Sequence, residues 1–318
     1  MTRIATLVVS LLLATAVGAQ SYPNRAVRII VPWPPGQATD IAARVVAEKL
    51  SQQLGQAFVA DNRPGAGGSI GTDAVAKSAP DGYTLLAASS GPISIMPNLQ
   101  KTPYDPLKDL APISLIAAVP FALVTHPSFP AANAREFVAL VKANPGKYTF
   151  ASSGTGATAH LFGELFNSVA GIQARHVPYK GTAPAITDIM NGQVSYAVET
   201  VAATAGHVKS GRLKAYGVSS LRRTGALPDV PPLAEATGLA YEAAAWIGYA
   251  APPGTPREIL ARISSEMQKV LASEELKERF VALGMDAASS TPDEMAAFMR
   301  REQERYGTII RNANIKVE

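Results

Sequence analysis

The chain has 318 residues, of which 47% are hydrophobic and 17% are charged, and this composition is typical of a globular protein with room for two domains. The formal net charge is +4 and the basic residues are scattered along the chain, which argues against a nucleic-acid-binding surface. Cysteine is absent, which excludes disulfides, thiol nucleophiles, thiolate metal sites and a lipidated cysteine.

The first twenty residues have the layout of a secretory signal peptide. Arg3 gives a positive charge, residues 7–17 are apolar, and small residues precede a cleavage site after Ala19. The apolar stretch is too short for a membrane anchor, and no other segment approaches the ~20 apolar residues that span a bilayer. We therefore expect residues 1–19 to be removed and the mature protein to be exported, soluble and not lipidated; a buried N-terminal helix is the alternative.

Strands and helices are predicted to alternate along the mature chain. A buried strand at 27–31 precedes a helix from Asp40 to Leu54, whose apolar residues recur every four positions and which Gly55 ends. The same patterns predict further strands beginning at 58–59 and at 83–88, 149–152, 175–178, 194–198 and 213–219, and helices at 72–78, 161–169, 182–191 (with Thr182 as N-cap) and from Arg257 onward. Repeated β–α units indicate an α/β fold with largely parallel sheets.

Two segments suggest that the chain crosses between two domains. The segment 109–127 predicts one strand that stops at Pro120 and a second strand that continues beyond it, and 243–256 has a similar character. Crossings near residues 119 and 243 would make 119–243 an inserted domain, with 20–118 and 244–318 together forming the other domain. A ligand cleft between two α/β domains is a common consequence of this layout.

The sequence contains no recognisable catalytic or metal-binding set. The G-x-S-x-G, H-E-x-x-H and P-loop motifs are absent, and the four histidines (His126, His160, His176 and His207) are too far apart to show ligand spacing. We expect no metal, no cofactor and no enzymatic activity. The alternative is a secreted hydrolase that uses Ser152 or Ser153 as nucleophile, with His160 or His176 brought close by the fold as its base.

A possible dinucleotide fingerprint lies at residues 154–159. It has the G-x-G-x-x-A form, follows a predicted strand and opens a predicted helix. The acidic residue that should end the next strand is absent, because residues 178–180 are Pro-Tyr-Lys. The fingerprint is therefore better interpreted as a polar turn.

Four polar turns rich in Gly, Ser and Pro stand out, several of them at predicted helix N-termini. They are PPGQATD (34–40), SSGP (89–92), SSGTGATAH (152–160) and YKGTAP (179–184). Helix N-termini leave backbone N–H groups unpaired and carry the positive end of the helix dipole, so they bind anions without a full cation. Capping alone would explain any one turn. Four such turns, shared between two predicted domains, indicate a carboxylate-binding cleft.

The ordered combination of these motifs resembles one family. In sequence, VPWPPGQATD, NRPGAGGSIG, PDGYTLL, FASSGTGATAHLFGELF and VPYKGTAPAITDIMNGQV are similar to the Bug family of extracytoplasmic solute receptors, the binding components of tripartite tricarboxylate transporters. The resemblance runs from about Tyr22 to the C-terminus. It implies a type II periplasmic binding protein fold, in which two α/β domains joined by two crossover strands enclose a ligand cleft.

The resemblance also implies the function. It predicts a monomeric periplasmic receptor that captures a small organic acid (a mono- or dicarboxylate, with aromatic acids and amino acids included) and delivers it to membrane transporter subunits. Part of the carboxylate recognition in this family runs through ordered water. A receptor that presents its ligand to a membrane signalling partner is the alternative with the same binding chemistry.

Residues of the ligand site are carried over from the same motifs. The loop 34–40 is expected to hold the ligand, with prolines that fix the backbone so that its N–H groups point into the cleft, and with Asp40 as a structural cap of the next helix. The predicted ligand-binding residues are Trp33, Pro35, Gly36, Gln37, Ala38, Thr39, Ser89, Ser90, Ser153, Gly154, Thr155, Gly156, Thr158, His160, Tyr179, Gly181, Thr182 and Glu199.

Two positions depart from the family pattern. Gln37 stands where the family usually has a second glycine, and Glu199 stands where it commonly has aspartate. We expect Gln37 at the cleft mouth, with its amide facing the ligand or a bridging water. Glu199 is expected either to accept a hydrogen bond from an amine or hydroxyl of the ligand or to cap a helix. Both changes affect which carboxylate is bound.

Overall fold

The computed structural model describes residues 22–312 and 315, so the predicted signal peptide lies outside the described residues. In chain order the first elements are β1 (Val27–Val31), α2 (Ala38–Leu54), β2 (Phe58–Asn62), η2 (Ala66–Gly68), α3 (Ser69–Ala76), β3 (Thr84–Ser89), η3 (Gly91–Ile95), α4 (Met96–Leu99) and β4 (Ala111–Thr125). They are followed by α5 (Ala134–Lys142), β5 (Thr149–Ser152), α6 (Thr158–Ala170), β6 (Arg175–Pro178), α7 (Thr182–Met190), β7 (Tyr196–Thr200), α8 (Val201–Lys209) and β8 (Lys214–Val218). The last elements are α9 (Leu233–Thr237), β9 (Ala244–Ala251), α10 (Arg257–Ala272), α11 (Glu274–Ala282), β10 (Asp286–Ala287) and α12 (Pro292–Asn312).

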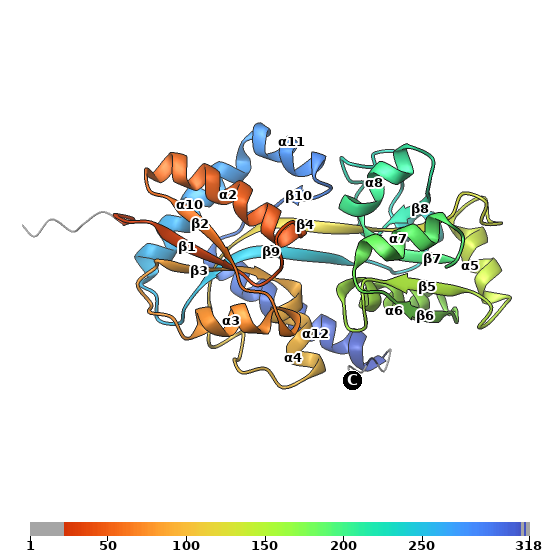
Figure 1. Cartoon of the computed structure of the whole chain (residues 1–318), viewed down its shortest axis with the longest axis horizontal. Helices are drawn as coiled ribbons and strands as arrows, with labels where there is room; N and C mark the ends of the chain where they lie inside the picture. The colour runs from red at the N-terminus through yellow and green to blue at the C-terminus, as the bar shows by residue number, and fades with distance from the viewer. Residues whose placement is uncertain (1–21, 313–314, 316–318) are drawn as a thin grey trace, which may run out of the picture.

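These elements form two lobes that lie side by side (Figure 1). The first lobe holds β1–β3, β9 and β10 with α2–α4 and α10–α12, and the second lobe holds α5–α9 with β5–β8. The strand order is β2-β1-β3-β9-β4-β7-β5-β6, with β10 and β8 also paired to β4. The outer pairs of both lobes are parallel, as predicted, but β9 is antiparallel to β3 and β4, and β4 is antiparallel to β7.

Both faces of each lobe's sheet are covered by helices. In β1, Ile29 packs on the face shared with α2 and α10, whereas Ile30 packs on the opposite face with residues of α3, η3 and α12. Burial on both faces explains why the strand reads as a continuous apolar run in the sequence. In the second lobe, α5 and α6 cover one face and α7 and α8 cover the other.

Strand β4 belongs to both lobes. Its first part, up to Pro120, pairs with β9, and its last part, from Phe121, pairs with β7 and β8. The prediction that the strand stops at Pro120 is therefore wrong. A proline lacks the N–H that a central strand would donate, and Pro120 is tolerated because it stands where β4 exchanges one set of partners for the other.

Four helices begin earlier than the sequence pattern predicted or at a different cap. Helix α2 begins at Ala38, α3 at Ser69 and α6 at Thr158, each two or three residues before its predicted start, and Gly181 rather than Thr182 is the N-cap of α7. Apart from Ile70 in α3, the residues before the predicted starts are small or polar, so they lack the apolar periodicity on which the prediction depends. No helix among residues 22–312 has both the length and the apolar character needed to cross a membrane.

The segments that connect the lobes are held together by Ser219. Its backbone N–H donates to the carbonyl of Phe121 (2.8 Å), and its carbonyl accepts from the N–H of Ala243 (2.9 Å). Its hydroxyl accepts from the Phe121 N–H (2.9 Å) and donates to the Ala243 carbonyl. Because Phe121 follows the partner change in β4 and Ala243 precedes β9, this buried serine bonds both connections. The division into 20–118 with 244–318 and 119–243 stays a prediction, which these features support.

We predict that Ser219→Ala lowers the free energy of unfolding by about 1–3 kcal/mol, because the Phe121 N–H and the Ala243 carbonyl each lose a buried partner. Urea denaturation followed by circular dichroism measures the change. Ser220→Ala is the matched control, since the Ser220 hydroxyl is bonded only to an exposed carbonyl at Arg222, and it should change stability by less than about 0.5 kcal/mol. Equal effects of the two substitutions would contradict the role given to Ser219.

Candidate functional site

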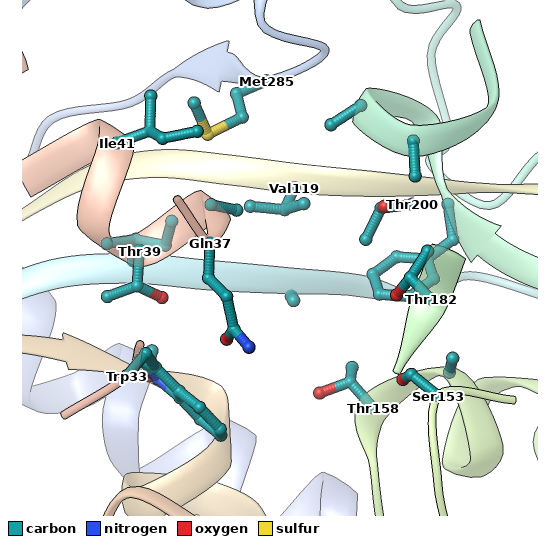
Figure 2. Close-up of a pocket in the computed structure, with 18 of the residues that line it drawn as sticks. Trp33, Gln37, Thr39, Ile41, Val119, Ser153, Thr158, Thr182, Thr200 and Met285 are labelled. Atoms are coloured by element: carbon teal, nitrogen blue, oxygen red, sulfur yellow. The ribbon is translucent and has the colours of Figure 1, made fainter. Parts of the chain in front are cut away.

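A cavity of about 700 Å³ lies between the two lobes. Figure 2 shows Trp33, Gln37 and Thr39 on its first-lobe side and Ser153, Thr158 and Thr182 facing them from the second lobe. All four polar turns that the sequence singled out contribute to its wall. The fold therefore brings together segments that lie up to about 150 residues apart in the chain.

Four helices begin at this cavity. The N-terminal residues of α2, α6, α7 and α8 line it, and none of the four helices has a side-chain cap hydrogen bond at its N-cap residue. The N–H groups of a helix's first turn have no partner within the helix, and the helix dipole adds partial positive charge there. The cavity thus offers donor groups for an anion from both lobes.

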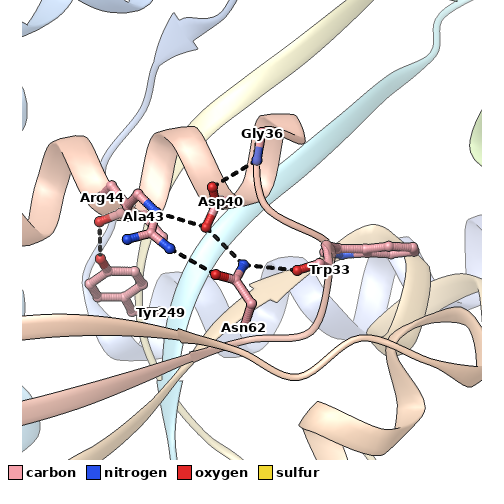
Figure 3. Close-up of polar contacts among 7 residues, drawn as sticks. All are labelled: Trp33, Gly36, Asp40, Ala43, Arg44, Asn62 and Tyr249. Atoms are coloured by element: carbon pink, nitrogen blue, oxygen red, sulfur yellow. Dashed lines mark hydrogen bonds and ion pairs between the residues drawn. The ribbon is translucent and has the colours of Figure 1, made fainter. Parts of the chain in front are cut away.

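Asp40 fixes the loop that leads into α2 (residues 33–37) through hydrogen bonds on the side away from the cavity (Figure 3). One carboxylate oxygen accepts from the Gly36 N–H (2.9 Å), and the other accepts from the Asn62 side-chain amide (2.8 Å) and the Arg44 Nε–H (2.9 Å). Asn62 also donates to the Trp33 carbonyl (2.9 Å), so both ends of the loop are fixed to one network. Asp40 is buried and lies outside the cavity wall, which supports the structural role predicted for it.

Asp40 does not occupy the N-cap position, which belongs to Gln37. Its carboxylate reaches back from the third helical residue, and the Gly36 N–H points to it instead of into the cleft, which corrects the prediction for that N–H group. Gln37 is exposed and lines the cavity, and its side chain extends into it (Figure 2).

The electrostatic balance around Asp40 favours its ionised form. Burial by itself would raise the pKa of this carboxyl, but the hydrogen bonds from Gly36 and Asn62 and the charge of Arg44 together hold the pKa below its usual value.

Part of the second-lobe wall rests on a stack of aromatic rings. His160 and His176 lie 3.8 Å apart between ring centroids, and Phe150 stacks on His176. The Gly156 N–H donates to Nδ1 of His160 (3.1 Å), and this hydrogen bond fixes the loop 153–157. His160 itself does not line the cavity. The sequence predicted that His160 contacts the ligand, and its position outside the cavity wall argues against that contact.

The hydroxyl of Ser152 lies 2.6 Å from Nε2 of His176, which is the pairing that the hydrolase alternative requires. Ser152 is 1% exposed, does not line the cavity, and is bonded to the backbone of Gly154. Burial, with a smaller contribution from His160, lowers the pKa of His176 to about 4, far from the value that suits a general base at neutral pH. Ser153, which does line the cavity, has no hydrogen bond to a histidine among those the described residues form.

The predicted ligand-binding residues divide into two groups. Those that line the cavity are Trp33, Gly36, Gln37, Ala38, Thr39, Ser89, Ser90, Ser153, Thr158, Gly181, Thr182 and Glu199. Those outside its wall are Pro35, Gly154, Thr155, Gly156, His160 and Tyr179. Tyr179 bonds Asp188 through its hydroxyl (2.7 Å), which explains its position outside the wall. Contact of the first group with a ligand stays a prediction.

Apolar residues form much of the wall, although nothing in the sequence pattern marked them as site residues. They include Ile41, Val119, Phe121, Ile247, Leu283 and Met285. Their apolar patterns are those of core residues, so periodicity alone gave no sign that they face a cavity. Among the described residues, Glu199 is the one ionisable side chain in the wall. The site therefore combines backbone donors, hydroxyls and an amide with an apolar surface and a single acid.

Comparison with known proteins gives relatives over almost the whole chain. The family described as the tripartite tricarboxylate transporter family receptor matches residues 42–315. Protein BugT of Bordetella pertussis is 39% identical over 311 residues, which cover 96% of this chain and 94% of BugT.

Solved structures give a similar result. Rpa4515 of R. palustris, described with adipate, is 31% identical with a TM-score of 0.82 over 93% of this chain and 99% of that one. MatC of Rhodopseudomonas palustris, described with bound malate, is 30% identical with a TM-score of 0.76 over 91% of this chain and 100% of that one.

We predict that Asp40→Asn lowers the free energy of unfolding at pH 7 by about 1.5–3 kcal/mol, because the ionised carboxylate accepts charge-assisted hydrogen bonds that a neutral amide does not replace. The pKa of Asp40 is lowered by folding, so its contribution is present above the unfolded-state pKa of about 3.9 and is lost as the pH falls through the lower folded-state value. Urea denaturation from pH 7 to pH 3 should therefore show the difference between variant and wild type narrowing below about pH 4.

Asp81→Asn is the control for this experiment, since the ion pair between Asp81 and Arg25 is exposed and should contribute less than about 1 kcal/mol. A difference between Asp40→Asn and wild type that does not change with pH would show that the Asp40 charge is not what holds the loop.

Proposed function

The chain belongs to the tripartite tricarboxylate transporter receptor family, and on that premise we propose that it captures a small organic carboxylate between its two lobes and delivers it to a membrane transporter. The predicted family and the type II periplasmic binding protein fold are both confirmed by the comparisons. We place the mature receptor in the periplasm, which the signal-peptide pattern of residues 1–19 supports.

One observation supports carboxylate capture more than any other: the N-termini of α2, α6, α7 and α8 all open into one cavity. Helix N-termini favour negative charge without requiring a lysine or arginine. Among the described residues no basic side chain lines the cavity, so a carboxylate bound here would be held by neutral donors.

The location of the cavity supports capture and release. It lies between lobes that are connected through β4 and the segment before β9, so a change in the angle between the lobes would open or close it. Hinge motion around a ligand is the common mechanism of two-lobed binding proteins. The receptor would close on its ligand and present the closed form to the transporter.

We further propose that the protein catalyses no reaction on its ligand. The serine with a histidine partner, Ser152, is buried behind the wall, and its hydroxyl is engaged with the loop backbone. Two of the relatives named above are described with intact organic acids, adipate and malate, and we propose that this chain likewise binds its acid without changing it.

A thermal-shift screen tests the proposed function. We expect at least one organic acid from a panel of mono-, di- and tricarboxylates, amino acids and aromatic acids to raise the melting temperature. A ligand at one hundred times its Kd adds about 2.7 kcal/mol of stability, which is easily detected. The uncharged amides of the same acids serve as controls. A panel in which no acid stabilises the protein more than its amide would refute carboxylate capture.

We predict that Gln37→Gly weakens binding of the preferred acid by about ten- to a hundredfold, because a side-chain hydrogen bond to a charged group contributes about 1.5–3 kcal/mol. The melting temperature of the empty protein should hardly change, since Gln37 is exposed and has an extended backbone. Isothermal titration calorimetry measures the affinity.

Gln193→Gly removes the same side chain at an exposed position away from the cavity and should leave the affinity unchanged. If Gln37→Gly also leaves the affinity and the ligand preference unchanged, Gln37 has no part in recognition.

A further inference from the structure

Glu199 is a buried acid in the wall of the anion-binding cavity. It lies near the end of β7, and only 2% of its surface is exposed. One carboxylate oxygen accepts from the Thr200 N–H (2.8 Å), and the other accepts from the Thr182 hydroxyl (3.2 Å). Thr200 is the N-cap of α8 and Thr182 is the first residue of α7, so the carboxylate lies between two helix N-termini.

This position makes Glu199 an anion that the protein itself supplies. Burial raises the pKa of its carboxyl above the usual value, and the hydrogen bonds from Thr200 and Thr182 offset only part of that rise. Each carboxylate oxygen accepts a hydrogen bond from a neutral donor, and these bonds stabilise the ionised form that the carboxyl takes above its raised pKa. The partial positive charges of α7 and α8 are then already matched by a negative group.

The N-termini of α2 and α6 present no acid to the cavity: α6 has none in its first turn, and Asp40 of α2 is bonded to Gly36, Arg44 and Asn62 outside the wall. Ala38 and Thr39 begin the first of these helices, Thr158 begins the second, and the two starts face each other across the cavity (Figure 2). The wall around these starts and Glu199 also holds apolar side chains, among them Val119 and Phe121. A ligand carboxylate would therefore lie between α2 and α6, with its carbon skeleton against the apolar wall.

We propose that Glu199 determines specificity by excluding a second carboxylate from the end of the cavity formed by α7 and α8. The preferred ligand is an organic acid with one carboxylate and, at its far end, a hydroxyl, amide or ammonium group that donates a hydrogen bond to Glu199. This proposal rests on carboxylate capture as the function. It sets the chain apart from the two relatives described with the dicarboxylates adipate and malate.

The experiment compares acids that share a skeleton and differ only at the far end. The sets are succinate with 4-hydroxybutyrate and 4-aminobutyrate, adipate with 6-hydroxyhexanoate and 6-aminohexanoate, and terephthalate with 4-(hydroxymethyl)benzoate. Affinities are measured at pH 8 by isothermal titration calorimetry. In the set that fits the wild-type cavity, we expect the acid whose far end is a hydroxyl or an amine to bind at least about tenfold more tightly than the dicarboxylate. The second carboxylate of the dicarboxylate would lie against Glu199, and two like charges in contact are strongly unfavourable.

Glu199→Gln then tests the residue itself. The glutamine amide has the same shape and still accepts from the Thr200 N–H, but it carries no charge. The preference for the acid with a far-end hydroxyl or amine over the dicarboxylate should therefore fall by about tenfold or more, and the dicarboxylate should gain affinity. Glu258→Gln, an exposed acid in the first turn of α10, is the matched control and should keep the wild-type preference.

The possible outcomes separate this inference from the proposed function. Wild-type protein that binds a dicarboxylate as tightly as its partners, or more tightly, overturns the inference and leaves carboxylate capture intact. A donor preference that persists in Glu199→Gln also overturns it, because another group must then select the ligand. If no acid of any set binds, carboxylate capture fails and the inference fails with it. If Glu199→Gln does not fold, the wild-type comparison can still overturn the inference.

Discussion

Backbone N–H groups at the start of an α-helix have no carbonyl partner within the helix, and much of this structure depends on where those groups are placed. Helices α2, α6, α7 and α8 begin at one cavity, and their N-cap residues provide no side-chain cap. Unpaired donors near an apolar wall are costly unless water or a ligand satisfies them. The site is therefore defined by unpaired backbone N–H groups and not by a cluster of charged side chains.

The same requirement explains how the surrounding residues are arranged. Asp40 and Asn62 fix the loop before α2 from the side away from the cavity, and His160 supports the loop before α6 in the same way. Both loops owe their geometry to polar groups outside the wall, so the groups inside it stay available. The two lobes also meet beside the cavity: Gly284 lies so close to Ala202 that a side-chain carbon added to Gly284 would be 2.4 Å from the Ala202 Cα. A glycine here lets the lobes come together.

Much of this arrangement could be predicted from the sequence, and the failures have physical causes. Strands at 27–31, 149–152 and 175–178 were predicted with the observed bounds, because apolar runs between turn residues determine them. The four polar turns were recognised because they interrupt those runs. The path of β4 through Pro120 was not predicted, since a proline lacks the N–H that a strand donates and the point at which a strand changes partners is a property of the whole fold. Val119 and Phe121 were missed for a related reason: an apolar residue in a strand has the same pattern whether it faces a core or a cavity.

If helix N-termini of both lobes hold the ligand carboxylate, the backbone amide signals at those N-termini report on it directly. Two-dimensional ¹H–¹⁵N NMR spectra recorded during titration with a stabilising acid should show the amides of Ala38, Thr39, Thr158 and Ala159 shifting together, with one Kd that matches calorimetry. Carboxylate binding at these N-termini would be contradicted if these amides stayed unchanged while the signals that moved belonged to a second hollow beside α12, which Arg301 and Arg305 line together with Glu242 and Glu304.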